Sequence, residues 1–265
     1  MKRATAAFAA LLLLLAACSS SGGGKKKDSG SPAKSSGSSA PSGTTVNVYA
    51  ASSLTEAFTT LKTQFERAHP GSTVKLKFGA SSELSTQITQ GAPADVFAAA
   101  SLQNTNTLVR AGVATDPLPF ASNSLEIAVP PSNPGKVTSV RDLADKGVKV
   151  AVCDPAVPCG AVAAKVFVKA KITVKPVSNQ PDVKSTLAVV ESGEVDAGLV
   201  YVTDVRAAGS KVKGLPLPAS INASTEYGIV ALKKTQNSTL AKAFVNLVTS
   251  AAGQQVLRAD GFGRP

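Results

Sequence analysis

The stretch VNVYAASSLTEAF, from Val46 to Phe58, begins as an alternating β-type pattern and continues, after a serine pair, as an amphipathic helical pattern. The stretch VKLKFGASSELSTQI, from Val74 to Ile88, has the same layout. In both, apolar residues recur at helical spacing after the serines. Ser53 and Glu56 also have the spacing of a capping box, which predicts that a helix begins at this point. Each stretch therefore predicts a strand, a tight turn and a helix.

A turn of this kind can hold an anion without a cationic side chain. The first backbone N–H groups of a helix have no intrahelical partner and lie at the positive end of the helix dipole, and a serine hydroxyl adds a further donor. Two such turns facing each other would form a cage of hydrogen-bond donors. A serine at a helix start can also simply cap its helix, so capping and binding are alternatives that can coexist.

The remainder of the chain alternates strand-like with helix-like segments, which predicts an α/β protein with parallel sheets covered by helices. Its length suits two lobes. Strands are expected at 95–98, 125–129, 148–153, 174–177, 198–203 and 227–232. Helices are expected at 101–110, 161–171, 181–192, 238–249 and 251–259, and a further one after Ser139.

The first 18 residues have the pattern of an export signal. Two basic residues precede an apolar run over 6–17, which is shorter than the about twenty residues that a membrane-spanning helix needs. The run ends in Leu15-Ala16-Ala17-Cys18, which looks like the lipobox of bacterial lipoproteins and predicts a lipid on Cys18. A plain signal peptide with a chance cysteine is the alternative. Residues 19–43, rich in Ser, Gly, Lys and Pro, predict a disordered tether outside the membrane.

The net charge of +11 overstates how basic the folded part is. Residues 1–43 hold six basic residues and one acidic residue, a net of +5, which leaves +6 for the rest of the chain. No basic cluster is interleaved with aromatic residues, and tryptophan is absent from the sequence. The composition therefore excludes a typical nucleic-acid-binding surface.

Two cysteines remain once Cys18 is assigned to lipid. Cys153 and Cys159 share the short segment CDPAVPC, and an exported compartment favours their oxidation. We therefore predict a disulfide between them, which would hold the segment rigid, with two free thiols as the alternative. Zinc binding is not favoured, because the spacing is wrong and the only histidine, His69, precedes Pro70.

Several blocks of the sequence resemble, in order, the molybdate-binding receptors of bacterial ABC importers. They are AASSLTEAF, FGASSELSTQI, GAPADVFAAAS (91–101), VAVCDPAVPCG (150–160), DVKSTLAVVESGEVDAGLVYVTD (182–204) and the closing Gly261-Phe262. The resemblance implies the two-lobed periplasmic-binding-protein fold with the ligand in the cleft between the lobes. By that resemblance lobe one comprises 44–121 and 227–265, and lobe two comprises 122–226.

The resemblance also implies a set of ligand-binding residues. Ser53 and Ser81 would each donate a hydroxyl and a backbone N–H, and Tyr201 would donate its phenolic O–H. Cys159 and Val183 would each donate a backbone N–H at a helix start; relatives often carry a smaller residue at Cys159. The molybdenum would be held only through its oxygens. A tyrosine in an apolar strand is otherwise a typical core residue.

The expected receptor is a monomer without a cofactor that binds molybdate or tungstate and delivers it to a membrane permease. A cage of donors suits molybdate, because this dianion has no proton, whereas the proton of hydrogen phosphate would face only donors. A receptor for another oxyanion such as sulfate or phosphate is the alternative. A serine-dependent enzyme is the least favoured interpretation, because no G-x-S-x-G or P-loop motif occurs and His69 is badly placed to act as a base.

Overall fold

The computed structural model describes residues Thr45–Pro265. The predicted signal segment, the lipid on Cys18 and the tether over 19–43 lie outside the described residues. Within the described part, no helix combines the length and the apolar character needed to cross a bilayer.

Nine strands of the described chain form one mixed sheet in the order β2-β1-β3-β9-β4-β7-β5-β6, with β8 paired to β4. β1 pairs in parallel with β2 and β3, and β5 pairs in parallel with β6 and β7. The strands are β1 (Thr45–Ala51), β2 (Thr73–Gly79), β3 (Val96–Ala99), β4 (Leu118–Val129), β5 (Val150–Cys153), β6 (Ser178–Gln180), β7 (Ala197–Tyr201), β8 (Lys213–Pro216) and β9 (Ser224–Ala231).

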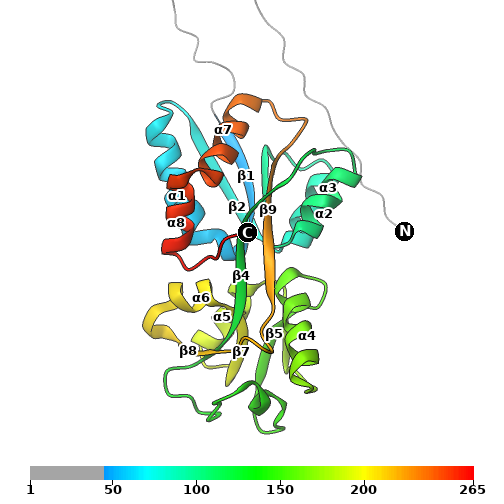
Figure 1. Cartoon of the computed structure of the whole chain (residues 1–265), viewed down its shortest axis with the longest axis vertical. Coiled ribbons are helices and arrows are strands. Elements are labelled where there is room, and N and C mark those ends of the chain that lie inside the picture. Colours follow the sequence, from blue (N-terminus) through cyan, green and yellow to red (C-terminus); the bar gives the residue numbers. More distant parts are fainter. Residues whose placement is uncertain (1–44) are drawn as a thin grey trace, which may run out of the picture. The chain divides into compact units, whose positions relative to one another are not determined.

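The long strand β4 runs through both halves of this sheet (Figure 1). Up to Ser124 it pairs antiparallel with β9, and from Leu125 onward it pairs with β7 and β8. We call the part around β1, β2 and β3 the first lobe, and the part around β5, β6, β7 and β8 the second lobe. The expected domain limits at 121/122 and 226/227 fall inside β4 and β9, and they stay a prediction.

Helices cover both faces of the sheet in each lobe (Figure 1). The first lobe carries α1 (Thr55–Ala68), α2 (Ser81–Thr89), α3 (Leu102–Arg110), α7 (Ser238–Thr249) and α8 (Ala251–Ala259). The second lobe carries α4 (Pro158–Ala170), α5 (Val183–Glu191) and α6 (Val202–Ala208). Short 3-10 turns lie at η1 (Ser52–Leu54), η2 (Val140–Ala144) and η3 (Gly209–Lys211).

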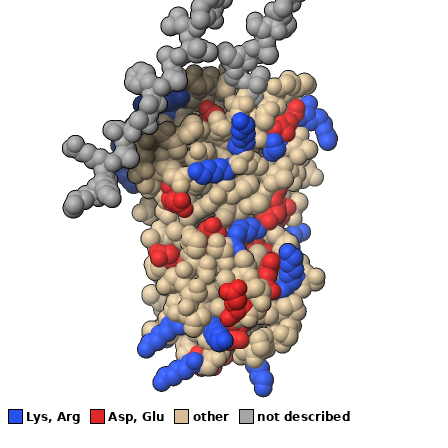
Figure 2. All heavy atoms as spheres, turned by 180° about the vertical axis from the view of Figure 1, so that it is seen from behind, with Lys and Arg blue, Asp and Glu red and all other residues tan. Residues whose placement is uncertain are grey.

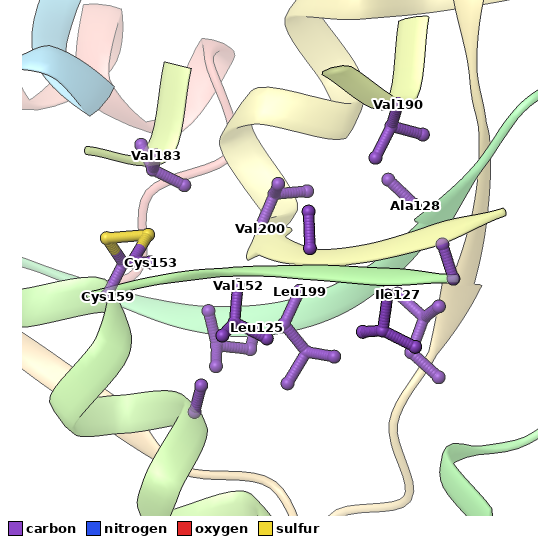
Figure 3. Packing of buried hydrophobic residues seen from close by; sticks show 14 of the residues in the cluster. Leu125, Ile127, Ala128, Val152, Cys153, Cys159, Val183, Val190, Leu199 and Val200 are labelled. Carbon is purple, nitrogen blue, oxygen red and sulfur yellow. A yellow bond between two sulfur atoms is a disulfide. The ribbon is translucent and has the colours of Figure 1, made fainter. Parts of the chain in front are cut away.

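The apolar residues form separate clusters on the faces of the sheet. In the first lobe, Phe58 and Phe65 of α1 pack edge-on against Phe244 of α7, with ring centroids 5.8 and 5.4 Å away. A second cluster lies beneath α2 and α3. In the second lobe, aliphatic residues such as Leu125 and Leu199 form the core (Figure 3). Burial of the apolar faces of the helices in these clusters stabilises the helices more than helix propensity does.

Charged side chains are interspersed over the surface. On the face drawn in Figure 2, lysines and arginines alternate with aspartates and glutamates over both lobes. This distribution agrees with the modest positive charge of the folded part.

The predicted α/β class is confirmed, and the two C-terminal helices begin and end where they were expected. The strand predicted at 174–177 is wrong: β6 begins at Ser178, and the Val177 N–H just before it donates to the Val150 carbonyl of β5 at 2.9 Å. Pro176 has no N–H to donate to a ladder. The helix expected after Ser139 is the short turn η2, in which the Asp142 carboxylate accepts a bond from the Ser139 N–H at 2.9 Å. Helix α6 and strand β8 had not been predicted.

Asp95, which precedes β3, joins three segments of the first lobe. Its carboxylate is buried and accepts hydrogen bonds from the Asn47 backbone N–H at 2.7 Å, from the Asn47 side-chain amide at 3.1 Å and from the Thr235 hydroxyl. These bonds fix the start of β1 to the segment that leads into α7.

We therefore expect Asp95→Ala to lower the free energy of unfolding by about 2–3 kcal/mol, because donors that face the carboxylate lose their acceptor. Urea denaturation followed by circular dichroism measures this loss. Asp145→Ala, at an exposed position, is the matched control and should change stability by less than about 0.5 kcal/mol. Equal stability of both variants would contradict the anchoring role of Asp95.

Candidate functional site

A narrow pocket lies between the lobes, and all five predicted binding residues line it. The first lobe contributes the turn after β1, the turn after β2 and Ala100 after β3. The second lobe contributes the starts of α4 and α5 and the end of β7. The lining residues are Ala51, Ser52, Ser53, Gly79, Ala80, Ser81, Ala100, Val157, Pro158, Cys159, Asp182, Val183 and Tyr201.

The pocket is surrounded by helix starts. α2 begins at Ser81, α4 at Pro158 and α5 at Val183, while η1 begins at Ser52 and leads into α1. Backbone N–H groups in the first turn of a helix lack intrahelical acceptors and carry the positive end of the dipole. Neither lysine, arginine nor histidine is among the lining residues. The described residues thus form a site rich in donors and without a cationic side chain, and Asp182 is the charged residue among those that line it.

The predicted capping box of Ser53 and Glu56 is wrong. A 3-10 turn over 52–54 delays the start of α1 to Thr55, so its cap residue is Leu54 and no side chain caps the helix. Ser53 is 3% exposed, and its Oγ lies 2.8 Å from the Tyr227 hydroxyl. The Glu56 carboxylate instead pairs with the Lys184 Nζ at 2.7 Å. Ser53 is therefore free of a capping role.

Ser81 is the serine of the second turn that faces the pocket; Ser82 does not line it. The cap residue of α2 is Ala80, so Ser81 is the first residue of the helix and does not cap it. The Ser81 Oγ is buried and accepts a hydrogen bond from the backbone N–H of Ala100 at 3.0 Å.

Tyr201, at the end of β7, has a buried hydroxyl without a hydrogen-bond partner among the described residues. Burial, together with Tyr227 and Asp204, raises the pKa of Tyr201 well above its usual value, so the hydroxyl keeps its proton. An unpaired buried hydroxyl costs about 1–3 kcal/mol. A ligand oxygen in the pocket would remove that cost.

A disulfide joins Cys153, the last residue of β5, to Cys159, the second residue of α4 (Figure 3). It ties one wall of the pocket to the sheet. A Cβ on Gly160 would lie 2.0 Å from the carbonyl oxygen of Asp154, so only glycine lets the loop fold back this closely on the helix start.

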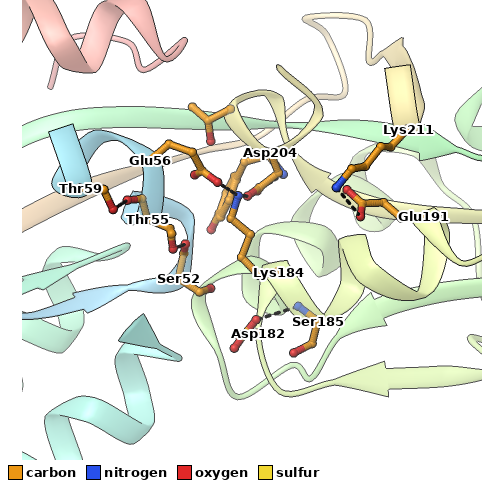
Figure 4. Close-up of polar contacts among 12 residues, drawn as sticks. Ser52, Thr55, Glu56, Thr59, Asp182, Lys184, Ser185, Glu191, Asp204 and Lys211 are labelled. Carbon is orange, nitrogen blue, oxygen red and sulfur yellow. Dashed lines mark hydrogen bonds and ion pairs between the residues drawn. The ribbon is translucent and has the colours of Figure 1, made fainter. Parts of the chain in front are cut away.

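Sequence reasoning had missed the charged residues beside the pocket. The Asp182 carboxylate caps α5 by accepting from the Ser185 N–H at 2.9 Å. The Lys184 Nζ lies 2.7 Å from Glu56 of the first lobe and 3.3 Å from Asp204 of the second (Figure 4). Lys184 thus connects the lobes, although a partly exposed pair of this kind contributes only about 0–1 kcal/mol.

Asp204 is fully buried, and its Oδ2 accepts a hydrogen bond from the Tyr201 backbone N–H at 3.1 Å. Burial raises the pKa of Asp204 to about 6, against the opposing effect of Lys184. Asp204 therefore helps to position the tyrosine that lines the pocket. The described residues contain no group of three His, Cys, Asp or Glu side chains that could hold a metal ion.

Comparisons with known proteins agree with this geometry. The chain matches the family model described as bacterial extracellular solute-binding protein over residues 46–263. It is 40% identical to a molybdate-binding protein ModA of Mycobacterium bovis, over 89% of this chain and 91% of the relative.

Two solved structures share the fold. The periplasmic molybdate-binding protein of Azotobacter vinelandii superposes with a TM-score of 0.75 at 22% identity, covering 83% of this chain and 99% of that one. The sulfate-binding protein SubI from Mycobacterium tuberculosis has a TM-score of 0.70 at 19% identity, covering 82% and 86% of the two chains. The predicted periplasmic-binding-protein fold is thereby confirmed.

The raised pKa of Asp204 gives a pH dependence of stability. A carboxyl whose folded pKa is about 6 and whose ordinary value is 3.8 contributes stability that is full below about pH 4 and lost as the pH rises through 6. In Asp204→Asn this contribution is missing at every pH, so only the unchanged protein should lose it as the pH rises. The free energy of unfolding of the variant minus that of the unchanged protein should therefore increase by about 2 kcal/mol from pH 4.5 to pH 7. Urea denaturation at several pH values measures the trend, with Asp145→Asn as the exposed control. If the difference in unfolding free energy between Asp204→Asn and the unchanged protein did not vary with pH, the raised pKa of Asp204 would be contradicted.

Proposed function

The chain belongs to the bacterial extracellular solute-binding proteins, and we propose that it is the extracytoplasmic receptor that binds molybdate and delivers it to an ABC importer. The observation that carries this proposal is the pocket itself. Helix starts from both lobes, three serines and an unpaired tyrosine hydroxyl line it, and no cationic side chain of the described chain does so.

Molybdate fits such a pocket chemically. It is a tetrahedral dianion with four acceptor oxygens and, at neutral pH, no proton. Hydrogen bonds to a charged group contribute about 1.5–3 kcal/mol each, so several of them outweigh an association cost of about 4 kcal/mol or more. Ser53, Ser81 and Tyr201 would donate their hydroxyl protons. Cys159 and Val183 would donate backbone N–H groups, and tungstate, with the same charge and shape, would bind in the same way.

Sulfate is the second candidate, because a sulfate-binding protein shares the fold and sulfate is also a tetrahedral dianion. The pocket would have to distinguish it by size, since sulfate is smaller. An enzymatic role has less support, because the matching family consists of solute-binding proteins.

The receptor would work together with the membrane permease of the importer. We propose that it is a monomer held to the outer face of the cytoplasmic membrane by the lipid on Cys18.

Isothermal calorimetry with molybdate, tungstate, sulfate and phosphate tests the ligand. We expect micromolar or tighter molybdate binding, weaker sulfate binding and the weakest phosphate binding. Ser53→Ala and Ser81→Ala should each weaken molybdate binding by about 1–3 kcal/mol, the loss of one charge-assisted bond. Ser238→Ala, at an exposed position of α7, is the matched control. Tighter phosphate than molybdate binding, or full affinity in both serine variants, would refute the proposed ligand and site.

Membrane fractionation tests the anchor. Cys18→Ala should move the protein from the membrane fraction to the soluble fraction, because the lipid is the proposed attachment. Labelling with a fatty acid should disappear in the same variant. A variant that stays membrane-bound and labelled would show that Cys18 is not the attachment point.

A further inference from the structure

One ion pair connects the two lobes beside the pocket. The Lys184 Nζ, from α5 of the second lobe, donates to the Glu56 Oε1, from α1 of the first lobe, at 2.7 Å (Figure 4). The other ion pairs among the described residues each lie within a single lobe. The Lys184–Glu56 pair can therefore exist only while α5 and α1 are as close as they are in this structure.

Both partners are next to residues of the pocket. Lys184 directly follows Val183, whose backbone N–H is a proposed ligand donor. Glu56 is the second residue of α1, and the turn η1 just before this helix carries Ser53. Helix α5 also packs against η1 of the opposite lobe. The ion pair thus joins the two elements that would hold a bound oxyanion from opposite sides.

Asp204 holds Lys184 in place within the second lobe. The buried Asp204 Oδ1 lies 3.3 Å from the Lys184 Nζ, and the Asp204 Oδ2 accepts from the Tyr201 backbone N–H at 3.1 Å. The Lys184 side chain is 25% exposed. A lysine held in this way loses little further conformational freedom when it pairs with Glu56, so less of the attraction is offset by entropy.

We propose that Glu56 is a positioning residue of the ligand site: through Lys184 it holds the start of α5 against the pocket and slows the release of the bound oxyanion. The proposal rests on the proposed function and deepens it. An interaction that is present only when the lobes are together favours that arrangement, and a ligand that contacts both lobes gains affinity as a result. For a partly exposed ion pair this gain is about threefold.

The negative charge of Glu56 gives this role a distinctive sign. Glu56 lines a cavity that shares Ser53 with the pocket, so its carboxylate is close to where an anion would bind. By Coulomb repulsion alone, removing this carboxylate would strengthen anion binding. Since Glu56 instead holds Lys184 across the lobes, removing the carboxylate weakens anion binding. Charge repulsion and the inter-lobe contact therefore predict opposite changes in affinity.

Calorimetric titration with molybdate measures the affinity of the unchanged protein and of Glu56→Gln, which keeps the shape of the side chain and removes its charge. We expect the variant to bind about threefold more weakly. Glu56→Asp should also bind more weakly, because it keeps the charge but sets the carboxylate back from Lys184 by one methylene group. The matched control is Glu83→Gln, at an exposed position of α2 where the carboxylate accepts from Gln87 of the same helix at 2.8 Å. This control should not weaken binding.

A double-mutant cycle shows whether Glu56 acts through Lys184. In a Lys184→Gln background, Glu56→Gln should no longer weaken binding, whereas a merely structural role of Glu56 would give the same loss in both backgrounds. Should Lys184→Gln fold poorly, the loss in Glu56→Gln is measured at low and high salt and should shrink as salt screens the ion pair. Unchanged or stronger binding by folded Glu56→Gln, an equal loss in both backgrounds, or a loss independent of salt would overturn the proposal.

Failure of the proposed function would look different, because the unchanged protein itself would prefer another oxyanion to molybdate. The same variants are then titrated with that oxyanion, since the ion pair acts on any ligand held by both lobes. Failure of the role of Glu56 appears only in the ratio of variant to unchanged affinity.

Discussion

The antiparallel pairing of β4 with β9 is the constraint on which the pocket depends. The first residues of β4 pair with β9 and its last residues pair with β7 and β8, so a single strand belongs to both lobes. Asn123 and Tyr227 lie on these two strands, beside the point where β4 changes partners. The Tyr227 hydroxyl, which lies 2.8 Å from the Ser53 Oγ, therefore connects this pocket residue to the strands that join the lobes.

No cationic side chain of the described chain lines the pocket, and a lysine next to the pocket is paired with carboxylates. Lys184 lies between Glu56 of the first lobe and the buried Asp204 of the second (Figure 4). A free lysine in the pocket would bind anions of any kind, whereas fixed N–H groups bind only at defined positions. By pairing with two carboxylates, Lys184 connects the lobes without contributing to the lining. In the proposed function, recognition would then rest on backbone N–H groups and side-chain hydroxyls.

Much of the fold and of the site could be predicted from sequence, for reasons that are local. Strand, turn and helix follow one another within a few residues around Ser53 and Ser81, and the resemblance to a receptor family added Cys159, Val183 and Tyr201, which also line the pocket. The network behind Ser53 left no such signal, because Tyr227 lies 174 residues away along the chain. The capping box is absent because the 3-10 turn over 52–54 delays the start of α1, and Glu56 pairs instead with Lys184, which is distant in sequence. The spacing of Ser53 and Glu56 alone therefore did not predict the local structure.

Binding through the backbone also explains which side chains the site can spare. At Cys159 and Val183 the proposed donor is the N–H, which every residue except proline provides. The side chain of Cys159 is thus free to bond to Cys153, and the resulting bridge fixes the start of α4 instead of contacting the ligand. In the proposed binding mode, the side chains themselves would donate at Ser53, Ser81 and Tyr201. Both serines also contact a polar group behind the surface of the pocket: the Ser81 Oγ accepts from the Ala100 N–H at 3.0 Å, and the Ser53 Oγ lies 2.8 Å from the Tyr227 hydroxyl.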